Sequence, residues 1–167
     1  MRRQYTREEY IEICKKIRTQ IPDVTITSDF IVGFPGETDE QFEETLSVID
    51  EVELDYSNTA AYSPRKQTPA ATWRDRYIDE QTKKERLFIL NEKVKKASRF
   101  SNEKYLGRVL EVLADGSKQE DEKTIITGRT RNGKLVHFEG NKNLIGTLVN
   151  IKIEGAFLWC LKGKVEV

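Results

Sequence analysis

A helix-then-strand pattern that occurs twice over residues 6–62 constrains the fold more than any other feature of the sequence. Each copy opens with a capping box, in which a hydroxyl precedes a Glu or Gln side chain by three residues: Thr6 with Glu9, and Thr38 with Gln41. Apolar residues recur at helical spacing behind each box, and β-rich runs follow at residues 24–32 and 54–62. This alternation of helix and strand is typical of a parallel α/β fold.

Two strands are too few for a complete domain of that kind. An eight-fold barrel needs about 250 residues, and a parallel sheet normally has both of its faces covered. We therefore expect residues 1–77 to be the C-terminal part of a larger barrel whose first part is missing, through design or proteolysis. The uncovered sheet surface predicts self-association between chains.

The pattern changes after residue 77. Residues 78–105 predict one long polar helix that links the two halves, and residues 106–167 predict a separate domain of short strands. The predicted strands cover residues 108–113, 124–130, 134–138, 147–153 and 158–165. Turns are expected at Asp115-Gly116, Asn132-Gly133 and Glu154-Gly155, and Asn-Gly between apolar runs is a strong hairpin signal. Five short strands indicate a small closed β-barrel of the oligonucleotide-binding kind, so the fold class is α/β plus all-β.

The charge distribution and the cysteine content limit the kinds of function that fit this sequence. Residues 1–77 carry 10 lysines and arginines against 15 aspartates and glutamates, whereas residues 105–167 carry 10 against 8. The mildly basic second half is compatible with nucleic-acid contact. No stretch approaches the roughly 20 apolar residues of a membrane span, and two isolated cysteines do not form a disulfide framework, so we expect a cytoplasmic protein.

The segment 28–38 is the best candidate for a ligand site in the first half. It reads as a strand that ends in a glycine-rich turn and leads into a helix, and ligands bind at this edge of parallel sheets. A phosphate loop would need glycine where Ile31 stands and lysine where Glu37 stands, so nucleoside triphosphate binding is rejected. Ser28 and Asp29 suit a ligand with hydroxyl or ammonium groups. Arg65, after the next strand, can hold a carboxylate or can be a solvated loop residue.

Polar residues gather around the predicted hairpin of the second half. Lysine and arginine side chains there can bind phosphates, and a histidine can stack on an unpaired base, although a solvated strand face would look the same. The predicted RNA-binding residues are Arg129, Arg131, Asn132, Lys134 and His137.

Three ordered motifs give the sequence a family resemblance. Residues 28–38 (SDFIVGFPGET), 62–71 (YSPRKQTPAA) and 128–140 (GRTRNGKLVHFEG) resemble the C-terminal half of the radical S-adenosylmethionine methylthiotransferases, in the branch that modifies tRNA. The resemblance covers essentially the whole chain. It implies the end of a TIM-like radical barrel, a helical linker and a TRAM β-barrel.

The resemblance also implies cofactors and roles. Members of the family use S-adenosylmethionine and two 4Fe-4S clusters, and add a methylthio group to a modified adenosine near the anticodon. The sequence has no Cys-x-x-x-Cys-x-x-Cys loop, so we expect no cluster, no metal ligand and no catalytic residue in this chain, which alone should be inactive. The expected partner is the tRNA anticodon stem-loop. The implied cofactor-binding residues are Ser28, Asp29, Ile31, Gly33, Ser63 and Arg65.

Two other functions stay open. A stand-alone RNA-binding module would explain residues 78–167 but gives no purpose to segment 28–38. A methylthiotransferase that acts on a ribosomal protein would share the architecture, and its β-barrel is expected to be less basic than one with Arg129, Arg131 and Lys134.

Overall fold

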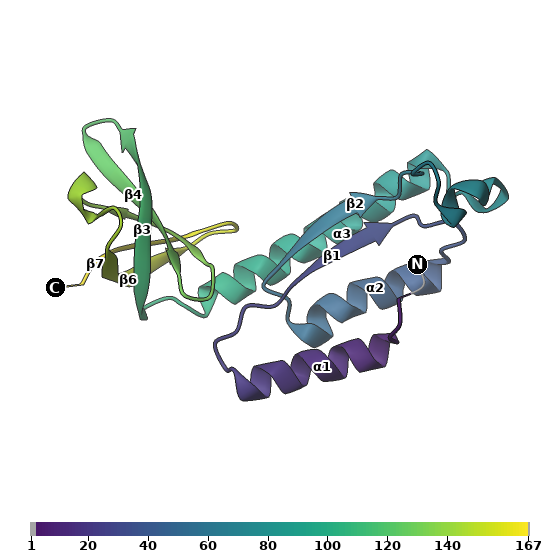
Figure 1. Ribbon diagram of the computed structural model, residues 1–167, viewed down its shortest axis with the longest axis horizontal. Helices are drawn as coiled ribbons and strands as arrows, with labels where there is room; N and C mark the ends of the chain where they lie inside the picture. Colours follow the sequence, from purple (N-terminus) through teal and green to yellow (C-terminus); the bar gives the residue numbers. More distant parts are fainter. Residues whose placement is uncertain (1–2, 167) are drawn as a thin grey trace. The chain divides into compact units, whose positions relative to one another are not determined.

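The computed structural model describes residues 3–166, which form two compact units. The first unit contains the chain up to Pro22 and residues Ile26–Ala97. The second contains Asp23–Thr25 and the chain from Ser98 onward. Figure 1 shows helices and a short sheet in the first unit and a β-barrel in the second. An α/β segment followed by an all-β barrel is the predicted fold class, which is confirmed.

The first unit follows the predicted alternation. Its elements are α1 (Arg7–Gln20), β1 (Thr27–Val32), α2 (Asp39–Val52), β2 (Tyr56–Ala61), the short 3-10 helices η1 (Pro69–Thr72) and η2 (Arg74–Arg76), and α3 (Glu80–Glu103). Strands β1 and β2 pair in parallel. Both predicted capping boxes form: the side chains of Thr6 and Thr38 accept hydrogen bonds from the third residue of their helices, and those residues return the bond.

One face of the two-stranded sheet supports the core, and the other is open. Phe30 and Val32 of β1 pack in a cluster with apolar residues of α1, α2 and α3, of which Ile49 and Leu90 are fully enclosed. The alternate β1 side chains are exposed, as the two-residue period of a strand requires. On that open face Asn58 donates a 2.8 Å hydrogen bond to the Asp29 carboxylate.

The second unit is a closed five-stranded barrel. Its strands are β3 (Val109–Glu120), β4 (Lys123–Thr130), β5 (Leu135–Glu139), β6 (Leu148–Ala156) and β7 (Leu161–Val165), with the 3-10 helix η3 (Lys142–Leu144) before β6. The order is β3-β4-β5-β7-β6, and β6 closes the barrel on β3. All pairs are antiparallel except β5 with β7. Inward-facing residues such as Val112, Ile126, Phe138 and Ile151 fill the interior.

Two of the three predicted turns are wrong. Asp115-Gly116 lies inside β3 and Glu154-Gly155 lies inside β6, and each marks a shift in strand register. Glycine serves here as a β-bulge, since the strands of a small barrel must bend sharply to close. The Asn132-Gly133 turn is confirmed, and Gly133 adopts a φ of 84° that favours glycine.

Within the part of the chain that the structure describes, no helix is both long enough and apolar enough to cross a membrane.

Candidate functional site

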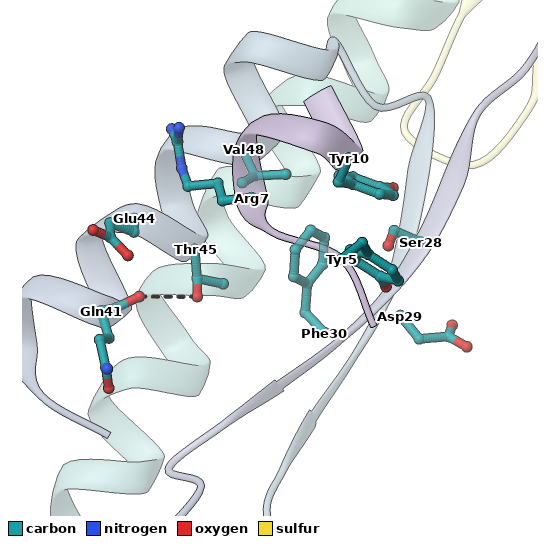
Figure 2. A pocket seen from close by; sticks show the side chains of 10 residues that line it. All are labelled: Tyr5, Arg7, Tyr10, Ser28, Asp29, Phe30, Gln41, Glu44, Thr45 and Val48. Atoms are coloured by element: carbon teal, nitrogen blue, oxygen red, sulfur yellow. Dashed lines mark hydrogen bonds between the residues drawn. The ribbon is translucent and has the colours of Figure 1, made fainter. Parts of the chain in front are cut away.

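The three predicted cofactor residues of β1 do not share one face. Ser28 is half-buried on the side of the helices, whereas Asp29 and Ile31 lie on the open face. Figure 2 shows Ser28 and Phe30 beside Tyr5 and Tyr10, with the Asp29 carboxylate pointing away from them. The strand period puts Ser28 and Ile31 on opposite faces, whereas Ser28 and Asp29 both line one pocket.

Ser28 borders a pocket of about 240 Å³ between β1, α1 and α2. The rings of Tyr5 and Tyr10 stack at 5.9 Å along its rim. Burial raises the pKa of Tyr10, and a hydrogen bond with Ser28 opposes this. The pocket therefore presents hydroxyl and ring surface, to which Arg7 adds a cation and Asp29 and Glu44 add carboxylates.

The space above Gly33, at the end of β1, is filled by the protein itself. A side chain at this position would lie 2.2 Å from Cγ of Lys83, and Gly33 has a φ of 70°. Its N–H donates to the Glu37 carboxylate at 2.5 Å. Arg86 of α3 donates to the same Glu37 oxygen at 2.7 Å and to Asp39 at 2.6 Å. Gly33 thus allows a close approach to its backbone, and the approaching group is the Lys83 side chain.

The network of Gly33, Glu37 and Arg86 is almost closed to solvent. The side chains of Arg86 and Glu37 are 8% and 10% exposed. Burial opposes the charge on Arg86, but its hydrogen bonds to Asp39 and Glu37 prevail and raise its pKa. The sequence motif contained Glu37, but its partner stands 49 residues away, and no local pattern connects the two.

Ser63 and Arg65 lie in the exposed loop after β2, at the same sheet edge as the end of β1. The Tyr62 N–H donates to the Val32 carbonyl at 2.8 Å, which fixes the start of this loop. Edge-to-face contacts of Phe34 with Tyr62 and Trp73 support it. Of the predicted cofactor residues, Asp29, Ile31, Ser63 and Arg65 are exposed and Ser28 borders the pocket, so together they offer carboxylate, hydroxyl and guanidinium groups.

Two of the predicted RNA-binding residues fix the hairpin between β4 and β5. The buried Lys134 ammonium donates to the Ser101 hydroxyl at 2.9 Å and lies 5.6 Å from the centre of the Tyr105 ring. The Asn132 amide donates to the Tyr105 hydroxyl at 2.7 Å and to the Asp23 carbonyl at 2.9 Å. Both side chains form hydrogen bonds within the second unit, where Lys134 is buried and Asn132 is half-buried.

The other basic residues of this hairpin face solvent. Arg129 and Arg131 are both exposed. Arg129 lies 4.0 Å from the Asp115 carboxylate and donates a weak 3.4 Å bond to the Gly133 carbonyl. Two guanidinium groups at a rigid turn can bind phosphates.

His137 is half-buried on the outside of β5. Burial first, and then the charges of Lys118 and Lys162, lower its pKa, so the imidazole is neutral at neutral pH. Its Nδ1 atom has no hydrogen-bond partner within residues 3–166. Positive charge on this part of the barrel therefore comes from lysine.

No group of three or more His, Cys, Asp or Glu side chains within residues 3–166 is arranged to hold a metal ion. Cys14 is buried and Cys160 is half-buried.

Comparison with known proteins identifies both units. Residues 1–49 match the radical SAM superfamily, and residues 103–165 match the TRAM domain. Together with the parallel α/β segment and the closed barrel, these matches define a radical SAM segment that is followed by a TRAM domain.

Related proteins are similar in sequence to nearly the whole of this chain. The tRNA-2-methylthio-N(6)-dimethylallyladenosine synthases of Geobacillus kaustophilus and Bacillus cytotoxicus are each 50% identical over 165 residues, 99% of this chain. That of Acetivibrio thermocellus is 45% identical over the same length. The chain spans about a third of these relatives, between 31% and 34%. The chain is thus similar to radical SAM proteins that carry a TRAM domain, and the resemblance drawn from the three motifs is confirmed.

Proposed function

We propose that the chain is the part of a tRNA methylthiotransferase that contributes one section of the S-adenosylmethionine site and the tRNA-binding domain. The observation that carries the proposal is the pair of exposed arginines, Arg129 and Arg131, on a hairpin that Asn132 and Lys134 hold rigid. A pre-organised pair of cations costs little entropy on binding a phosphate backbone. The names of the relatives specify tRNA with a modified adenosine as the substrate class.

The first unit has the chemistry for one section of a cofactor site. Asp29 on the open sheet face can pair with an ammonium group, and Arg65 in the loop after β2 can pair with a carboxylate. When bound, S-adenosylmethionine and its 4Fe-4S cluster supply the radical chemistry. The residues of this chain bind and orient, because the 167 residues include no cysteine triplet that could ligate a cluster. We therefore expect the chain alone to be inactive.

The ribosomal-protein alternative is less well supported. Its barrel would need no exposed cations at the hairpin, whereas Arg129 and Arg131 are exposed here. We further propose that the RNA contacted is the anticodon stem-loop, since the family that the three motifs resemble modifies an adenosine near the anticodon.

The test measures binding of a fluorescent anticodon stem-loop by anisotropy at about 50 to 200 mM salt. If two exposed arginines neutralise about two phosphates, log Kd should change with log salt with a slope magnitude of about 1.5 to 2. Arg131→Ala should weaken binding to all stem-loops alike and reduce the slope by roughly one. Arg76→Ala, which removes an exposed arginine of the first unit, is the matched control and should bind like wild type. Identical salt curves for wild type and Arg131→Ala would reject the hairpin as the RNA contact.

A further inference from the structure

The hairpin between β6 and β7 presents two aromatic side chains to solvent. Phe157 is 47% exposed and Trp159 is 56% exposed, although aromatic side chains of this size are mostly buried in folded proteins. We call residues 157–160 the aromatic hairpin. Neighbouring exposed aromatic side chains often mark a binding surface, whereas single exposed apolar side chains are common on any protein.

The aromatic hairpin is held in place from two directions. The Phe157 N–H donates to the Cys160 carbonyl at 2.9 Å, which closes the turn. The side chain of Asn102, which is 5% exposed, donates to the Phe157 carbonyl at 2.7 Å and to the Leu158 carbonyl at 3.4 Å. The loop backbone is thus fixed to the end of α3, and little ordering entropy would be lost when a partner binds.

Two lysines lie near the aromatic hairpin. The Lys162 ammonium lies 5.2 Å from the centre of the Phe157 ring, and its charge also acts on the Glu120 carboxylate. Lys118 lies close enough to act on the charge states of both His137 and Cys160, and its own partner is Glu120 at 2.5 Å. The Phe157 ring also lies against Gly155, where an added Cβ would lie 3.0 Å from the ring. The bulge glycine therefore makes room for the exposed ring.

We call residues 129–134, between β4 and β5, the arginine hairpin. The topology places the aromatic hairpin at the same end of the barrel as the arginine hairpin. Strand β5 begins just after the Asn132-Gly133 turn, and β7 begins just after the aromatic hairpin. Because β5 and β7 pair in parallel, with Val136 opposite Leu161, both hairpins emerge at one end. The same stretch of α3 holds both, through Ser101 to Lys134 and through Asn102 to Phe157.

We propose that the aromatic hairpin is a stacking platform for unpaired RNA bases, with Phe157 and Trp159 as the stacking residues and Lys162 as a phosphate contact. Proteins commonly bind single-stranded nucleic acid through aromatic side chains that lie beside cations, because every base has a face that can stack on an aromatic ring. The inference rests on the proposed function, which supplies RNA as the partner. It adds a second RNA-contacting surface that binds a different part of the RNA. The arginine hairpin binds phosphates, whereas the aromatic hairpin binds bases that are not held in a double helix.

The test uses the intrinsic fluorescence of Trp159. The only other tryptophan is Trp73, in the first unit, so Trp73→Phe leaves Trp159 as the single reporter. This protein is titrated with the anticodon stem-loop, with a single strand of about eight nucleotides, and with a fully paired duplex. Stacking predicts quenching by the stem-loop and the single strand, and much weaker quenching by the duplex.

Variants separate stacking from charge. In the same background, Phe157→Leu should weaken stem-loop binding about five-fold or more. Phe88→Leu removes a phenylalanine that is 67% exposed on α3 in the first unit and should leave the affinity unchanged. Lys162→Gln should reduce the salt slope by roughly one, with the quenching retained. Thermal unfolding confirms that each variant is folded.

The outcomes distinguish the inference from the proposed function. In one outcome the stem-loop binds and Arg131→Ala weakens its binding, but Trp159 fluorescence is not quenched and Phe157→Leu leaves the affinity unchanged. This result would overturn the stacking platform and leave the proposed function standing. An aromatic hairpin that binds a protein instead of RNA gives this same result. If no RNA binds the wild-type chain at all, the proposed function fails first and the inference falls with it.

Discussion

One buried ion pair, Arg86 with Glu37, fixes the backbone geometry of the turn at the end of β1. Arg86 neutralises Glu37, and Glu37 in turn holds the Gly33 N–H, so one guanidinium from α3 fixes the glycine-rich turn. Side-chain partners that lie far apart in the sequence cannot be read from spacing. For the same reason the sequence predicted Lys134 as an RNA contact, whereas the barrel places its ammonium against Ser101.

Arg86→Ala should destabilise the first unit by about 3 kcal/mol, because the Glu37 carboxylate would be left buried without its cation. The measurement is urea unfolding in a Trp159→Phe background, so that Trp73 reports on the first unit. Lys16→Ala removes half of an exposed pair with Glu12, with side chains 68% and 65% exposed, and should cost less than about 1 kcal/mol. Equal midpoints for the two variants would show that the network does not stabilise the turn.

The titration of His137 should occur below its ordinary pKa of 6.5, since burial and then Lys118 and Lys162 oppose its protonation. As the pH falls, His137 of the unfolded chain therefore binds a proton at a higher pH than His137 of the folded chain does. The stability that neutral His137 contributes is therefore complete above about pH 6.5 and is lost as the pH falls through the folded-state pKa. Because His137 is the only histidine, its NMR ring signals give the value directly. Lys162→Gln should move the pKa upward. A wild-type midpoint at or above 6.5 would contradict this environment.

At the scale of helices and strands, the elements set by local chemistry were predictable and those set by closure of the barrel were not. Both capping boxes and the Asn132-Gly133 turn are where the sequence predicts them, because each depends on residues within three or four positions. Gly116 and Gly155 looked like turn residues but form bulges, because whether a glycine ends a strand or bends it depends on the neighbouring strands.

Thr38→Ala should destabilise the first unit by about 1 kcal/mol, because it removes the hydroxyl that accepts the Gln41 N–H at the start of α2. Thr45→Ala, within the same helix, is the matched control. The Thr45 hydroxyl donates only to the Gln41 carbonyl, and alanine is the better helix former, so its effect should stay within about 0.5 kcal/mol of zero. Thermal or urea unfolding compares the two, and a Thr38→Ala protein as stable as wild type would show that the box contributes nothing.

At the scale of the whole molecule, the order of the elements was enough to predict a parallel α/β segment, a long helix and a small barrel. The candidate cofactor residues were harder to place. The sequence put Ser28, Asp29 and Ile31 in one site, but strand geometry turns Ser28 towards the helices and the other two towards the open face. The aromatic hairpin escaped prediction because the exposure of Phe157 and Trp159 depends on the loop held by Asn102.

The central claim is that tRNA binds at the end of the barrel that carries the arginine and aromatic hairpins. Hydrogen–deuterium exchange of the 167-residue chain, with and without the anticodon stem-loop, tests it most directly. RNA bound at these hairpins should slow exchange in peptides that cover residues 129–137 and 155–162, and should leave exchange in α1 unchanged. Slower exchange confined to the first unit, with both hairpins unaffected at saturating RNA, would contradict it.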